Sequence, residues 1–152
     1  MRNRFLLSAF LLVCAISHVQ AQVNFEKQGY SEAFDKATQQ NKILFVYFYT
    51  DWCAPCKQID TLVFSDPAIR AAINDNYVSL KLNAEKGEGI KLAKRYQVGG
   101  YPTFLFLDKN ARAMGRIVGT RGNSDYLTAI KSQGKNDPAR ERREKMLKEK
   151  KQ

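Results

Sequence analysis

The sequence predicts an α/β fold in which helices cover both faces of a central mixed β-sheet. The chain has 152 residues, 44% of them hydrophobic, which is enough for one domain with a single core. Residues 43–49 are all apolar or aromatic, as in a strand that is buried on both faces. Segments with helical periodicity alternate with strand-like segments along most of the remaining chain.

Residues 1–21 have the pattern of a secretory signal peptide. Arg2 and Arg4 precede a mostly apolar run at 5–16, and small side chains favour cleavage after Ala21. The apolar run is too short to span a bilayer, and nothing later in the sequence resembles a transmembrane span. We therefore expect a mature protein that starts at Gln22 and is periplasmic or secreted.

Two other interpretations of this segment stay open. One is a buried N-terminal helix, and the other is lipidation at Cys14, although Val13 is bulkier than lipoprotein signals require. Cleavage removes Cys14 together with His18, the one histidine of the sequence. The mature chain then holds only Cys53 and Cys56 and no imidazole, in a compartment that permits disulfides.

The first half of the domain is predicted to contain a helix, a strand and a second helix. Residues 31–40 have an amphipathic helical pattern, and the strand at 43–49 leads directly into the two cysteines. Helical periodicity then starts at about Ala54, where Pro55 is tolerated because the first turn does not use its missing N–H. The apolar residues with helix-face spacing are Ile59, Leu62 and Val63.

The second half is predicted to add three helices and three strands. Gly99-Gly100 ends one helical pattern, and 108–111 has the composition of a hairpin turn. The expected elements are helix 66–73, strand 77–82, helix 89–96 with apolar Ile90, Leu92, Ala93 and Tyr96, strands 103–107 and 112–118, and a helix from Asn123 or Ser124 to Ile130.

Residues 135–152 are expected to form a basic tail beyond a domain at 22–134. The tail carries eight basic and four acidic side chains, while the whole chain has a net charge of +10. Pairs such as Glu141 and Lys145 favour a solvated, partly disordered or helical extension. An anionic lipid or an acidic partner remains an alternative, but no aromatic residues are interleaved for stacking, so no nucleic-acid partner is expected.

The cysteine pair is the candidate functional site. Cys53 and Cys56 are three residues apart at a predicted helix start, so they are close enough to form a disulfide. The free N–H groups of the first turn stabilise a thiolate on Cys53 more than on Cys56. This asymmetry predicts that Cys53 attacks and Cys56 resolves, with no cofactor beyond the cysteines.

Other uses of the pair fit the sequence less well. A structural zinc site needs four ligands, which the mature chain lacks, so no metal is expected. Covalent haem attachment needs a histidine where the sequence has Lys57. A purely structural disulfide stays the main alternative, although so small a ring removes little entropy from the unfolded chain.

The segments FVYFYTDWCAPCK and KLNAEKGEGIKLAKRYQVGGYPTFLFLDKN resemble the thioredoxin superfamily. They are especially similar to exported bacterial thioredoxin-like proteins and to the thioredoxin-like domain of the periplasmic disulfide reductase. The resemblance covers about residues 30–131 and implies a thioredoxin fold. It also implies that Cys53 is the nucleophile and Cys56 the resolving thiol.

The same resemblance implies a substrate-binding surface beside the cysteines. Trp52 is expected to flank the active surface, and Pro102 to be a cis-proline next to the pair. The backbone of Tyr101 is expected to pair with an extended substrate segment.

One departure concerns proton transfer. Relatives carry a buried aspartate six residues before the first cysteine, where this chain has Tyr47, a poor base near neutral pH. Asp51, Lys57 or Lys81 are alternatives that act through water, but each fits an ordinary surface charge better. We expect slower release of mixed disulfides or a shifted potential. The turn at Ala111 lacks the usual glycine, which we expect to be neutral.

The sequence therefore predicts an extracytoplasmic thiol-disulfide oxidoreductase of the protein-disulfide reductase type. The dipeptide Ala54-Pro55 is close to the Gly-Pro of reducing thioredoxins and unlike the histidine-containing dipeptides of strong oxidants. The alternatives are an oxidase or isomerase, and a non-catalytic thioredoxin-fold binding module with a structural disulfide. The expected partners are protein or peptide disulfides and a redox recycling protein, and we expect a monomer.

Overall fold

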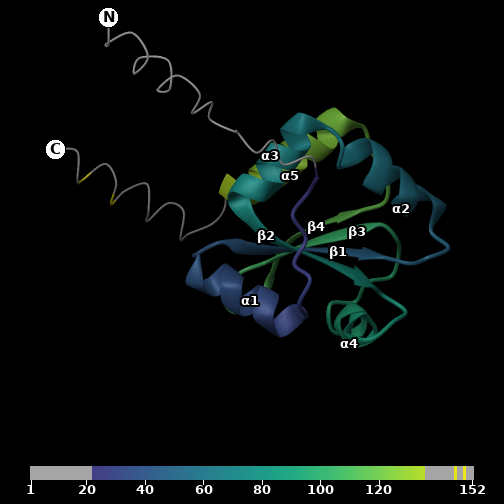
Figure 1. The fold of residues 1–152 in the computed structure, drawn as a ribbon, viewed down its shortest axis with the longest axis horizontal. Coiled ribbons are helices and arrows are strands. Elements are labelled where there is room, and N and C mark those ends of the chain that lie inside the picture. Colours follow the sequence, from purple (N-terminus) through teal and green to yellow (C-terminus); the bar gives the residue numbers. More distant parts are fainter. Residues whose placement is uncertain (1–21, 136–145, 147–148, 150–152) are drawn as a thin grey trace, which may run out of the picture.

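The computed structural model describes residues 22–135 together with Met146 and Glu149 (Figure 1). The predicted signal peptide at 1–21 lies outside these residues, as does most of the predicted tail. The elements in chain order are α1 (Tyr30–Gln39), β1 (Ile43–Tyr49), α2 (Ala54–Gln58), the π-helix η1 (Ile59–Val63), α3 (Pro67–Asn76), β2 (Tyr77–Asn83), α4 (Glu88–Arg95), β3 (Thr103–Leu107), β4 (Ala113–Val118) and α5 (Asn123–Lys135).

A four-stranded mixed sheet in the order β2-β1-β3-β4 forms the centre of the molecule. Strand β1 pairs in parallel with β2 and antiparallel with β3, and β4 adds antiparallel to β3. Strand β1 is buried along almost its whole length, as its unbroken apolar sequence predicts. The predicted α/β fold with a mixed sheet is confirmed.

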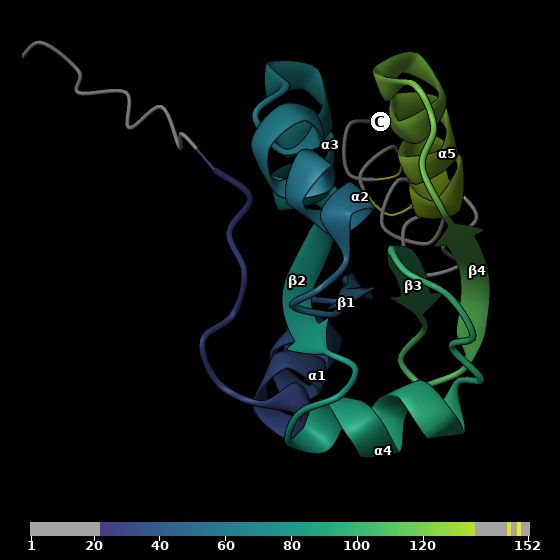
Figure 2. The same cartoon turned by 90° about the vertical axis from the view of Figure 1, so that its right-hand side faces the viewer.

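Helices cover both faces of this sheet (Figure 2). Helices α1 and α4 pack on one face, where Leu44, Val46 and Phe48 of β1 belong to their hydrophobic cluster. Helices α2, α3 and α5 cover the other face, with Phe45 and Tyr47 of β1 in a second cluster. Alternate side chains of one strand therefore supply two separate cores.

Two apolar residues do not lie where helical spacing placed them. Leu62 is 63% exposed, because η1 winds with i→i+5 hydrogen bonds and turns fewer degrees per residue than an α-helix. Ile90 is 53% exposed because Gly89 occupies the buried position instead. A Cβ on Gly89 would lie 2.0 Å from the carbonyl oxygen of Asn83, so only glycine permits this close approach.

The β3–β4 turn has an alanine in an unfavourable conformation. Ala111 has φ 56°, in the left-handed region that disfavours side chains with a Cβ. The expectation that the missing glycine is neutral stays a prediction, and this backbone conformation indicates a cost instead.

The segment before α1 runs along the outer edge of β2. Phe25 forms an isolated parallel bridge with Ser79, and the Glu26 N–H donates to the Ser79 carbonyl at 2.8 Å. This contact extends the sheet locally beyond its four strands.

Candidate functional site: a disulfide beside a cis-proline

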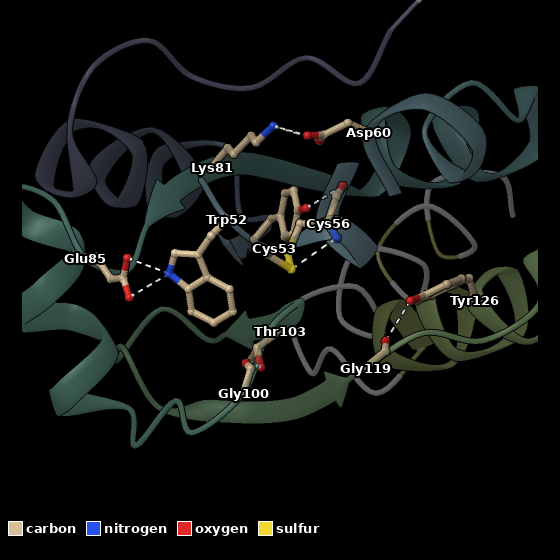
Figure 3. The surroundings of a disulfide bond; sticks show 11 residues. Trp52, Cys53, Cys56, Asp60, Lys81, Glu85, Gly100, Thr103, Gly119 and Tyr126 are labelled. Carbon is tan, nitrogen blue, oxygen red and sulfur yellow. Dashed lines mark hydrogen bonds and ion pairs between the residues drawn. A yellow bond between two sulfur atoms is a disulfide. The ribbon is translucent and has the colours of Figure 1, made fainter. Parts of the chain in front are cut away.

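Cys53 and Cys56 form a disulfide where β1 ends and α2 begins. Cys53 is the N-cap residue of α2, and its sulfur accepts a hydrogen bond from the Cys56 N–H at 3.2 Å. A donor from the first turn of the helix thus points at the sulfur predicted to attack (Figure 3). Both cysteines are buried in this oxidised form, with 2% and 1% of their surface exposed.

The chain between β1 and α2 turns sharply to place the pair. The Cys53 N–H donates to the Thr50 carbonyl at 3.2 Å, and the Cys56 and Lys57 N–H groups donate to the Cys53 carbonyl. Pro55 lies in the first turn of α2, where its missing N–H leaves no bond unmade. The position that the sequence predicted for the cysteine pair is confirmed.

The Tyr101–Pro102 peptide bond is cis, as the resemblance implied. It directly precedes β3, whose first residue Thr103 pairs with Phe48 near the end of β1. Because β1 and β3 are antiparallel neighbours, the last residues of β1 and the first residues of β3 lie side by side at one end of the sheet. Tyr101 packs against the hydrophobic cluster that contains both cysteines.

Trp52 lies on the surface next to the disulfide, with 67% of its area exposed. Its ring contacts Tyr101 edge to face, with 6.0 Å between centroids. Its indole N–H donates to both carboxylate oxygens of Glu85, at 3.1 and 3.0 Å (Figure 3). The structure therefore brings Trp52, Tyr101 and the cysteines together.

Glu85 belongs to a loop that supports the segment before the cysteines, and no pattern in the sequence singles out this residue. The Ala84 N–H donates to the Tyr49 carbonyl, and the Asn83 amide donates to the Asp51 carboxylate at 2.9 Å. Lys86 pairs with Asp51 at 2.7 Å, and its hydrogen bond holds the pKa of Asp51 below the usual value. The Asp51 carboxylate is thus bonded to Asn83 and paired with Lys86 on the surface.

Tyr47, at the position of the usual aspartate, is completely buried below α2. Its hydroxyl donates to the Cys56 carbonyl at 3.1 Å. Burial raises the pKa of Tyr47 well above its ordinary value, so the side chain stays neutral and acts as a hydrogen-bond donor.

An ion pair lies beside Tyr47. The Lys81 ammonium is 2.7 Å from the Asp60 carboxylate and lies over the rings of Tyr49 and Tyr47, at 4.7 and 5.3 Å. The sequence pattern favours Lys81 as an ordinary surface charge and does not single out Asp60, which lies four residues after Cys56 in the predicted helix.

The described part of the chain shows neither a metal centre nor a membrane helix. Between residues 22 and 135, no three His, Cys, Asp or Glu side chains are grouped so as to bind a metal ion. Across that same range, every helix is too short or too polar to cross a membrane.

A disulfide at a helix start, with a cis-proline directly before the neighbouring strand, defines a dithiol–disulfide protein of the thioredoxin fold. The model of the thioredoxin-like domain family matches residues 30–134, and the chain belongs to this family.

Known relatives agree with this assignment. The thiol:disulfide interchange protein DsbD of Haemophilus influenzae (strain PittEE) is 34% identical over 120 residues, which cover 72% of this chain and 20% of that protein. The chain therefore spans about a fifth of the length of this relative.

Two solved structures show the same fold. A disulphide-isomerase candidate from Bacteroides thetaiotaomicron is 36% identical with a TM-score of 0.67, and the match covers 77% of this chain and 98% of that chain. A thioredoxin from Thermus thermophilus is 31% identical with a TM-score of 0.66, covering 73% and 86%. The chain is thus a DsbD-like member of a family of thiol-disulfide oxidoreductases.

Proposed function

We propose that the protein is an extracytoplasmic protein-disulfide reductase. The observation that supports this most directly is the hydrogen bond from the Cys56 N–H to the Cys53 sulfur. In the reduced protein the same donor stabilises a Cys53 thiolate, the form of the side chain that acts as the nucleophile. Cys56 lies further into α2 and acts as the resolving thiol.

The reaction transfers two electrons to the substrate. The Cys53 thiolate attacks one sulfur of a substrate disulfide and expels the other sulfur as a thiolate, which leaves a mixed disulfide. Cys56 loses its proton and attacks the Cys53 sulfur, which releases the second substrate thiolate. The protein ends with the Cys53–Cys56 disulfide, and a dithiol partner must reduce it again.

Substrate binding is assigned to the surface around the cis-proline. An extended segment that pairs with the Tyr101 backbone, next to Pro102, would carry its disulfide towards Cys53. The exposed ring of Trp52 offers apolar contact area on the side of Tyr101.

An insulin-reduction assay tests the activity. With dithiothreitol as reductant, the wild type should accelerate insulin precipitation, and Cys53→Ser should reduce the rate to the uncatalysed level. Cys56→Ser should instead accumulate mixed disulfides with its substrates. Equal rates for the wild type and Cys53→Ser would contradict catalysis by the pair and favour the non-catalytic binding module.

The direction of electron flow is tested by the reduction potential. No histidine lies between the cysteines to stabilise the reduced thiolate, so equilibration with glutathione should give a value near the reducing thioredoxins, about −270 mV. A value near that of strong oxidants, about −120 mV, would favour an oxidase, and an intermediate value near −180 mV an isomerase.

Export depends on the signal-like residues 1–21. Cell fractionation of the producing bacterium, followed by mass spectrometry of the N-terminus, should find a chain that starts at Gln22 outside the cytoplasm. Recovery of the uncleaved chain in the cytoplasm would contradict this part of the proposal.

A further inference from the structure

Hydrogen bonds hold the Tyr101–Pro102 dipeptide from both ends. On one side, the Thr103 hydroxyl donates to the Gly100 carbonyl at 2.7 Å (Figure 3). On the other side, the Gly119 N–H donates to the Pro102 carbonyl at 2.9 Å. Because proline has no N–H, this carbonyl is the only backbone group of Pro102 that can bond to the β4 side. The placement of the dipeptide against β4 therefore depends on Gly119 together with the neighbouring pair of Thr103 and Val118.

Gly119 lies one residue beyond the β3–β4 pairing, which ends at Thr103 and Val118. It follows Val118, the last residue of β4, and has φ 75°, which glycine adopts readily and other residues do not. The Gly119 N–H is bonded to Pro102, and a second contact holds the Gly119 carbonyl. The Tyr126 hydroxyl provides it by donating a hydrogen bond to the Gly119 carbonyl at 2.8 Å (Figure 3).

Tyr126 is itself rigidly placed. It lies in α5, has no exposed surface, and its ring packs on Phe104 with 5.4 Å between centroids. A buried aromatic ring with close neighbours has little rotational freedom, so the hydroxyl is a fixed point. A chain of two hydrogen bonds thus joins α5 to Pro102 through Gly119.

We propose that Tyr126 is a positioning residue for substrate binding. Through Gly119 it holds the Pro102 carbonyl, and so keeps the Tyr101 backbone in the orientation that pairs with an extended polypeptide. This inference rests on the proposed function, because the proposed function places the substrate on the backbone of Tyr101. It predicts an effect on binding of extended substrates and no effect on the chemistry of the sulfurs.

The test compares Tyr126→Phe with Tyr77→Phe. Tyr77 is a matched control because it is also buried and its hydroxyl also donates to a carbonyl, that of Ile130 in α5. Both variants lose one hydroxyl and keep their ring. The substrates are a disulfide-linked peptide and a small aromatic disulfide such as 5,5′-dithiobis(2-nitrobenzoate), which has no extended backbone.

For Tyr126→Phe we expect the KM for the peptide to rise about three- to tenfold, the range that loss of one hydrogen bond produces. The rate with the small disulfide and the reduction potential should stay unchanged. Tyr77→Phe should leave all three values at the wild-type level. An unchanged peptide KM in Tyr126→Phe, or an equal rise in Tyr77→Phe, would overturn the assignment.

Amide hydrogen exchange separates this inference from the proposed function. Exchange of the Gly119 N–H should accelerate about tenfold in Tyr126→Phe and not in Tyr77→Phe, whether or not the protein reduces peptides. If the wild type lacks activity but Gly119 responds, the reductase proposal fails while the positioning contact stands. If Gly119 exchange is unchanged, the positioning contact is refuted.

Discussion

The Tyr47 hydroxyl donates a hydrogen bond to the backbone carbonyl of Cys56. It reaches α2 from β1, directly below the disulfide, at the position where relatives place an acid. The side chain therefore supports the backbone of Cys56, and burial, which raises the pKa of Tyr47, favours a role as donor over one as proton acceptor.

Tyr47→Phe should lower the free energy of unfolding by about 1 kcal/mol, because a buried carbonyl loses one donor while the ring and its packing remain. Urea denaturation of the oxidised protein measures this loss. The variant should keep the wild-type pH profile of insulin reduction below about pH 9, because Tyr47 is neutral throughout that range. A profile that shifts in the variant would show that Tyr47 does exchange a proton with the pair.

Glu85→Ala should release the Trp52 indole, which loses the acceptor of its N–H. Trp52 is the single tryptophan of the chain, so its fluorescence reports on this side chain alone. We expect lower fluorescence anisotropy and a change in unfolding free energy within about 0.5 kcal/mol, since Glu85 is exposed. Glu85→Gln keeps an acceptor and should restore the anisotropy, and equal values for all three proteins would contradict the contact.

Ala111→Gly should stabilise the protein by about 0.5–1 kcal/mol. Glycine removes the cost of a left-handed alanine, and its greater freedom in the unfolded chain offsets part of that gain. Thermal unfolding followed by circular dichroism checks the sign. A lower melting temperature would mean that the turn tolerates alanine without strain.

Asp66 makes stability depend on pH. Its carboxylate accepts hydrogen bonds from the Ile69 and Ala68 N–H groups at the start of α3 and from the Asn123 amide, and these bonds lower its pKa. A lowered folded-state pKa stabilises the protein above the unfolded value of about 3.9 and loses that effect as the pH falls through the folded pKa.

Asp66→Ala should therefore lower the unfolding free energy at about pH 7 and have a smaller effect at about pH 2. Asp66→Asn, which keeps a capping oxygen without the charge, should lie between the wild type and Asp66→Ala at the higher pH. Chemical denaturation at both pH values gives the comparison. Parallel losses at the two pH values would show that the charge plays no part.

The order of the elements and the place of the cysteine pair were predictable because both depend on local patterns. Strand β1 is an unbroken apolar run, and the bounds predicted for it match the structure. The cis bond before Pro102 was predictable only through the resemblance, since an X-Pro pair does not reveal its isomer.

Contacts between distant segments were not predictable in the same way. Glu85 and Asp60 look like ordinary surface acids in the sequence, and only the fold brings them to Trp52 and Lys81. Leu62 faces solvent because a π-helical turn changes the helix phase, and no feature of its own sequence window announces that turn.

The short bridge between Phe25 and Ser79 has a consequence for handling the protein. An uncovered strand at the margin of a sheet offers free N–H and C=O groups to other chains and favours aggregation. Residues before α1 shield this part of β2, so a version of the protein trimmed to the family match at residue 30 would leave it bare and should precipitate more readily than one that starts at Gln22.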